Sequence, residues 1–92
     1  MDYTFQDIKK QLEIGREIEF QYHNKQYSIT NWDGYWWIYN DTDHITLSKV
    51  DYRVKDSYKS LIQELSKLYI DNKSIVEIFD NLEYNTESLY IL

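Results

Sequence analysis

The sequence predicts an α+β domain in which helices cover one face of an antiparallel sheet. Apolar residues repeat at helical spacing near the start of the chain, at a period of two over the next segments, and at helical spacing again after residue 56. The 92 residues, 42% of them hydrophobic, suffice for one small core. We therefore expect a single domain over residues 1–92: an N-terminal helix, an antiparallel β-meander of about four strands, two C-terminal helices and a short terminal strand.

The first helix is predicted from its two ends. Thr4 followed by Asp7 resembles a capping box, and Gly15 is a natural left-handed C-terminal cap. Apolar and polar side chains then alternate over residues 17–22, which predicts a strand with one wet face. A turn at residues 23–25 leads to a second strand with the same alternation.

The third predicted strand, residues 35–39, follows a turn at residues 31–34 and is apolar on both faces. If Trp36 and Ile38 join the core, the other side chains stand on the opposite face, and these are Tyr35, Trp37 and Tyr39. Two interpretations stay open: a helix covers this second face, or it is an aromatic patch in solvent that serves as an interface hot spot.

The C-terminal half is predicted to begin with a fourth strand, in which Ile45 and Leu47 alternate with polar residues. A second helix begins at residue 56 or 57 and carries one apolar stripe, formed by Tyr58, Leu61, Ile62, Leu65 and Leu68. Residues 69–73 are expected to form a short extended connection.

A capping box formed by Ser74 and Glu77 opens the predicted third helix. This helix is expected to bury four residues, namely Ile75, Ile78, Phe79 and Leu82. The apolar tail, residues 89–92, is expected to dock as a final strand.

The charge disfavours direct binding to nucleic acid. Sixteen acidic against ten basic residues give a net charge of −6, the wrong sign for neutralising phosphates. The C-terminal part is especially acidic, with Asp71, Glu77, Asp80, Glu83 and Glu87. Such an end attracts basic surfaces, although a solvated face that only confers solubility remains the alternative.

The N-terminus lacks a basic segment followed by an apolar one, so it does not resemble a signal peptide. No apolar run is long enough to span a membrane. We therefore expect a cytoplasmic protein that does not bind membranes.

The residues that commonly carry catalysis are few. The chain has no Cys and two His, and its two Gly stand alone, so thiolate metal sites and phosphate-binding glycine loops are excluded. Glu17 and Glu19 share a strand face and are interpreted as solvated. Asp41, Asp43 and His44 could supply metal ligands for a hydrolase, but an ordinary polar turn is favoured. We predict no enzyme, no cofactor and no metal.

Three segments carry a resemblance. Residues 15–22 read Gly-Arg-Glu-Ile-Glu-Phe-Gln-Tyr, residues 25–29 read Lys-Gln-Tyr-Ser-Ile and residues 70–75 read Ile-Asp-Asn-Lys-Ser-Ile. This pattern resembles a family of small uncharacterised proteins of low-GC Gram-positive bacteria and their phages and mobile elements. Asn24 and Asn72 stand where that family tends to have Gly, and both turns should form because Asn tolerates the left-handed conformation. The resemblance supports the fold and implies no activity.

Gly, Ala, Arg and Pro together number only four, which is typical of an AT-rich genome and agrees with that origin. Small acidic proteins of phages often inhibit host defence nucleases, as anti-CRISPR proteins do. We therefore expect a non-enzymatic protein-binding module, an inhibitor of a basic nucleic-acid-binding protein in its most specific form. The predicted contact residues are the acidic set named above and an aromatic set, Trp32, Tyr35, Trp37 and Tyr39.

Two alternatives stay open. One is a binder of small molecules or glycans that uses the aromatic strand, and the other is a domain without inhibitory function. The oligomeric state is not determined by the sequence, and the aromatic face could also join two copies of the chain in a homodimer.

Overall fold

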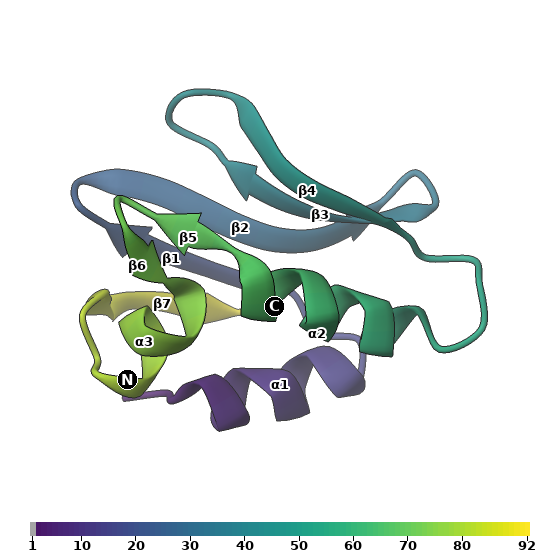
Figure 1. The fold of residues 1–92 in the computed structure, drawn as a ribbon, viewed down its shortest axis with the longest axis horizontal. Helices are drawn as coiled ribbons and strands as arrows, with labels where there is room; N and C mark the ends of the chain where they lie inside the picture. The colour runs from purple at the N-terminus through teal and green to yellow at the C-terminus, as the bar shows by residue number, and fades with distance from the viewer. Residues whose placement is uncertain (1) are drawn as a thin grey trace.

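A computed structural model describes residues 2–92 and shows the expected α+β architecture (Figure 1). A five-stranded antiparallel sheet has the order β4-β3-β2-β1-β7. Its strands are β1 (Ile18–Tyr22), β2 (Lys25–Trp32), β3 (Tyr35–Asn40), β4 (Ile45–Asp51) and β7 (Asn85–Ile91). The helices α1 (Phe5–Glu13), α2 (Ser57–Lys67) and α3 (Ile75–Asp80) lie on one side of this sheet, together with a small hairpin of β5 (Tyr69–Ile70) and β6 (Lys73–Ser74).

Helix α1 begins and ends as the sequence predicts. The Thr4 hydroxyl accepts from the Asp7 backbone N–H, and the Asp7 carboxylate accepts from the Thr4 backbone N–H at 3.0 Å. Gly15 has φ +86°, and its N–H and that of Arg16 donate to carbonyls of the last turn. This arrangement is a Schellman motif, in which a left-handed residue turns the chain away from the helix.

Three hairpin turns share one backbone conformation. Each has two central residues with positive φ: 50° and 62° at residues 23 and 24, 52° and 83° at residues 33 and 34, and 50° and 68° at residues 71 and 72. Positive φ at both positions matches the right-handed twist of the flanking strands. Asn24 and Asn72 therefore adopt the conformation expected of them. The extended connection predicted at residues 69–73 is wrong, because the turn folds it into the β5–β6 hairpin.

Strand β4 is longer than predicted, and its buried apolar side chain stands at another position than expected. Ile45, which the alternation placed on the apolar face of the predicted strand, is 49% exposed, and the buried apolar residue of this strand is Val50. A shift in register opposite Ile38 and Tyr39 adds one residue to β4 and interrupts its alternation. The shift pairs Ile45 with Asn40, on the same side of the sheet as Trp36 and Ile38, but Ile45 begins an edge strand and remains exposed there.

Helix α3 ends before the last residue predicted for it. Ser74 caps it, because its hydroxyl accepts from the Glu77 backbone N–H at 3.1 Å. Ile78 and Phe79 are buried as expected, but Leu82 is 38% exposed. Leu82 lies beyond the helix in a turn with φ +52°, where its side chain leaves the helical stripe.

The core lies between the helices and the sheet and contains a cluster of aromatic rings. Phe20 of β1 stacks on Tyr27 of β2 with ring centroids 5.5 Å apart, and it meets Phe79 of α3 edge to face at 4.9 Å. Tyr84 completes the cluster at 4.6 Å from Phe79. Strand β7 pairs with β1, which confirms that the apolar tail docks as a strand. Within residues 2–92, no helix is long and apolar enough to cross a membrane.

Candidate binding groove

The face of the sheet that points away from the core carries side chains in rows across the strands. Ser28 of β2 is paired with Glu19 of β1 on one side and with Tyr39 of β3 on the other. Thr30 is paired with Trp37, and Trp32 with Tyr35. Because alternate residues of a strand point to the same face, these rows lie side by side on one surface. We call this surface the open face.

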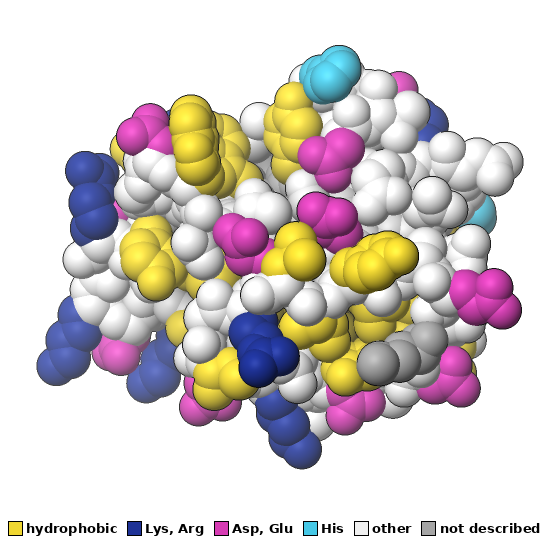
Figure 2. Space-filling model, turned by 180° about the vertical axis from the view of Figure 1, so that it is seen from behind, with side chains coloured by type: hydrophobic (Ala, Val, Ile, Leu, Met, Phe, Trp, Pro, Cys, Tyr) yellow, Lys and Arg dark blue, Asp and Glu magenta, His cyan; other side chains and the backbone are white. Residues whose placement is uncertain are grey.

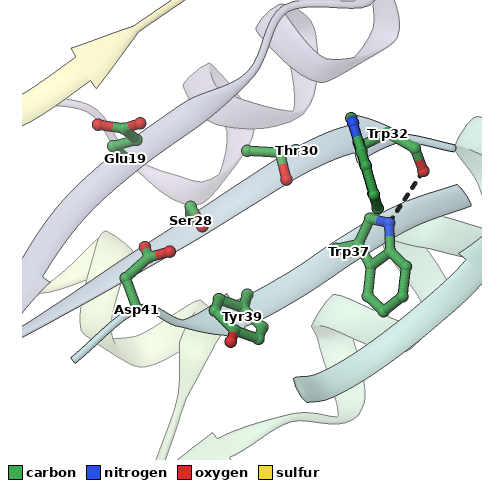
Figure 3. Close-up of a pocket in the computed structure, with 7 residues that line it drawn as sticks. All are labelled: Glu19, Ser28, Thr30, Trp32, Trp37, Tyr39 and Asp41. Carbon is green, nitrogen blue, oxygen red and sulfur yellow. Dashed lines mark hydrogen bonds between the residues drawn. The ribbon is translucent and has the colours of Figure 1, made fainter. Parts of the chain in front are cut away.

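A groove forms on the open face because its middle strand carries the smallest side chains. Ser28 and Thr30 form the floor, and larger side chains rise on β1 and β3. The groove encloses about 410 Å³ and is lined by Glu19, Ser28, Thr30, Trp32, Trp37, Tyr39 and Asp41 (Figure 3). Seen from behind the ribbon of Figure 1, acidic side chains lie between groups of hydrophobic ones (Figure 2).

Two tryptophans form one end of the groove. Trp32 is 70% exposed, whereas Trp37 is half-buried. The Trp37 indole N–H donates to the backbone carbonyl oxygen of Trp32 at 3.0 Å. This hydrogen bond holds the Trp37 ring in one orientation, so this part of the aromatic wall is already ordered before anything binds.

Two carboxylates, those of Glu19 and Asp41, line the groove without a cationic partner in the described part of the chain. Nearby acids differ in this respect. The Lys25 ammonium hydrogen-bonds to Asp43 and holds the pKa of that carboxyl below its usual value. The backbone and side chain of Arg53 likewise lower the pKa of Asp51. The groove thus keeps its negative charge available to a ligand.

Ser28 adds an unused hydrogen-bonding group. The residue is only 5% exposed, yet within residues 2–92 its hydroxyl makes no hydrogen bond. Solvent still reaches this hydroxyl, because within residues 2–92 the fully buried side-chain nitrogen or oxygen atom that lacks a partner is the indole nitrogen of Trp36. The Ser28 hydroxyl lies at the floor of the groove, where a ligand could bind it.

The structure decides the question left open for the aromatic strand. Tyr35, Trp37 and Tyr39 stand opposite Trp36 and Ile38, on the open face and partly exposed, and the helices lie on the other side. Of the predicted aromatic set, the groove brings together Trp32, Trp37 and Tyr39.

Tyr35 lies outside the groove. Its ring meets that of Trp37 edge to face at 6.0 Å, and the Lys49 Nζ is 4.3 Å from its centroid. The guanidinium of Arg53 is 5.5 Å from the same ring. Two cations of the chain itself therefore occupy this side of the aromatic wall.

The predicted acidic residues do not form one surface with the groove, and most of them already have partners. Asp80 accepts a hydrogen bond from the Phe5 backbone N–H at 3.0 Å, and the Glu77 carboxylate accepts one from the Ser74 hydroxyl. The remaining acidic contacts are Asp71 with His23 at 2.9 Å and Glu83 with Lys73 at 3.6 Å, while Glu87 is exposed. These contacts connect elements of the fold, which favours a structural role for this set.

The residues considered for a metal site make different contacts and do not face one common point. Asp41 lines the groove, and Asp43 is held by Lys25 and by the Asn40 side chain. Within residues 2–92, no group of three or more His, Cys, Asp or Glu side chains is arranged to hold a metal ion.

A second hollow of about 260 Å³ lies between the first hairpin turn and residues 83–85. Its imidazole, from His23, stacks on Tyr22 at 3.8 Å and bonds to Asp71, so it joins two hairpins.

Sequence reasoning did not identify Ser28 and Thr30, and it assigned other roles to Glu19 and Asp41. The sequence did contain a pattern from which the floor residues of the groove could have been predicted. The Asp33-Gly34 turn sets the pairing of β2 with β3, and counting back from it places the two small residues opposite Tyr39 and Trp37.

No family model, curated protein or solved structure matches this chain. The fold and the groove define a class without them: a small α+β protein with helices on one face of its sheet and an acidic, aromatic groove on the other.

Proposed function

We propose that this chain is a non-enzymatic binding module that holds a basic segment of a partner protein in the groove of its open face. The observation that carries the proposal is the placement of two carboxylates, which have no cationic partner within residues 2–92, beside the aromatic wall that Trp37 forms. Tyr and Trp dominate the energetics of protein interfaces, and carboxylates select partners of the opposite charge. The net charge of −6 adds long-range attraction for a basic protein.

A nucleic-acid-binding protein is the partner class that this charge favours, because such proteins carry basic surfaces. A chain bound to that basic surface would prevent the partner protein from binding its nucleic acid. The proposal therefore includes inhibition in the cytoplasm of a bacterial host, in the manner of an anti-CRISPR protein, as its most specific form.

The test uses three peptides of equal length that are basic, neutral or acidic, titrated into the isotopically labelled protein and followed by NMR. Trp32 and Trp37 report on the groove through their indole N–H signals, and Trp36, which is 2% exposed, serves as the internal control. The basic peptide is expected to shift the first two signals and not the third. Its affinity should fall several-fold as salt rises from about 0.05 to 0.2 M.

Matched variants locate the binding. Glu19→Gln removes a carboxylate of the groove, and Glu87→Gln makes the same charge change at an exposed position outside it. Only the first should weaken binding of the basic peptide. Equal binding of all three peptides, or equal loss in both variants, would contradict the proposal.

A second candidate function is glycan binding, which the exposure of Trp32 and the hydroxyl groups of the floor favour. Neutral oligosaccharides would then shift the same two indole signals with an affinity independent of salt, and the charged peptides would leave them unchanged.

A further inference from the structure

We infer that the groove selects an arginine side chain, and that Ser28, Glu19 and Asp41 accept hydrogen bonds from its guanidinium group. This inference rests on the proposed function, since it names the group of the basic partner that enters the groove. Three features of the groove support it: its two carboxylates, its aromatic wall and the Ser28 hydroxyl at its floor.

The acceptors approach the groove from different directions. Glu19 stands on β1, Asp41 follows the end of β3, and Ser28 lies on β2 between them (Figure 3). A guanidinium group is planar and carries five N–H donors that point outward in a fork, so it can serve several acceptors at once. A lysine ammonium is a compact, strongly hydrated charge, and it would lose more of its hydration in a half-enclosed groove.

The aromatic wall suits the flat face of a guanidinium. Arg stacks on aromatic rings more often than Lys does, and Trp is the best partner ring. The chain itself already places a cation beside this wall, because the Lys49 Nζ is 5.1 Å from the centroid of Trp37. The hydrogen bond from Trp37 to the Trp32 carbonyl fixes the ring in advance, which lowers the entropy lost on binding.

The Ser28 hydroxyl makes the floor of the groove favour a ligand that donates a hydrogen bond. This hydroxyl has no partner among the described residues and is open to solvent, so an apolar occupant would cover it without satisfying it. Leaving such a group unpaired in a complex costs affinity, whereas a guanidinium N–H satisfies it.

The experiment compares three peptides that are identical except for one central residue: arginine, lysine or citrulline, the neutral analogue of arginine. Binding is measured by calorimetry and located by the Trp32 and Trp37 indole signals. The arginine peptide is expected to bind about fivefold or more tightly than the lysine peptide, and the citrulline peptide to bind more weakly still. In Ser28→Ala and Asp41→Asn proteins the preference for arginine should shrink, and in Glu87→Gln protein it should stay unchanged.

The outcomes separate this inference from the proposed function. Equal binding of the arginine and lysine peptides in the groove would overturn the selection of arginine and leave the binding of a basic partner standing. Citrulline binding as tight as arginine would show that charge is not recognised and would overturn the inference. If none of the peptides moves the two indole signals, both proposals fail. The Trp36 signal verifies in each variant that the fold is intact, and the two groove variants test the same claim independently.

Discussion

Trp37 donates its indole N–H to the backbone carbonyl oxygen of Trp32 across 3.0 Å, and this bond ties together the two strands that meet at the Asp33-Gly34 turn. The two rings differ in their surroundings, because Trp37 is half-buried against its neighbours and Trp32 stands largely in solvent. One hydrogen bond thus orders a wall of the groove from within the hairpin itself.

Trp37→Phe should lower the free energy of unfolding by about 1 kcal/mol, because the aromatic area is largely kept and one hydrogen bond is lost. Trp32→Phe is the matched control: its indole makes no hydrogen bond within residues 2–92, so the change should stay within about 0.5 kcal/mol. Urea unfolding of both variants measures the difference. Equal effects of the two substitutions would show that the bond contributes nothing to stability.

Gly15→Ala should cost about 1–2 kcal/mol, because the residue has φ +86° and an L side chain is strained there. Apart from Gly15 itself and its two chain neighbours, no atom of residues 2–92 lies within 4 Å of the added Cβ, so the cost is conformational. Gly34→Ala has the same backbone strain, and its Cβ would also meet the Arg53 side chain at 3.2 Å. Arg53→Ala should therefore relieve part of the cost in the second variant and none in the first, which denaturant unfolding of the double variants tests.

Stability should fall as the pH drops below about 4, because the fold lowers the pKa of several carboxyl groups. Hydrogen bonds from Thr4, first from its backbone N–H, lower the pKa of Asp7, and the Lys25 side chain lowers that of Asp43. A carboxyl with a lowered pKa in the folded state stabilises the fold above the pKa of the unfolded chain, near 3.8, and loses this contribution as the pH falls through the folded value. In Asp7→Asn and in Asp43→Asn, the free energy of unfolding should fall less steeply as the pH drops below about 4. An unchanged slope in both variants would contradict the assignment.

Stability should also fall above pH 10, for the opposite reason. Burial raises the pKa of Tyr22, Tyr27 and Tyr84 above the ordinary value of 10.0. The unfolded chain then releases these protons at a lower pH than the folded protein, so the contribution is complete below pH 10 and is lost as the pH rises through the folded values. Ultraviolet absorbance of tyrosinate, followed together with circular dichroism, should show these groups ionising only as the fold is lost. Their ionisation in a still folded protein would be evidence against their burial.

The elements of this fold were predictable wherever the signal was local. The capping box at Thr4, the cap at Gly15 and the alternation over β1 depend on residues within a few positions of each other, and the structure confirms all three. The errors have several causes. Ile45 is exposed because β4 lies at the edge of the sheet, which depends on the strand order. Two local turns were also missed, the one that ends α3 before Leu82 and the one that forms the β5–β6 hairpin.

The groove was predictable only in part, for the same reason. Trp37 and Tyr39 were recognised from their strand, since a regular pleat places them opposite Trp36 and Ile38. Ser28 gave no signal of its own, because in the sequence a serine at the floor of a groove looks like any polar residue of a strand.

The sequence by itself determined most of the secondary structure, the acidic charge and the two-faced character of the aromatic strand, because propensity, charge and period are properties of neighbouring residues. Only the tertiary structure decided that the helices share one face, that Ser28 lies between Glu19 and Tyr39, and that Asp41 lines the same groove as the tryptophans. Those relationships depend on strand order and register, which bring together side chains that are distant along the chain.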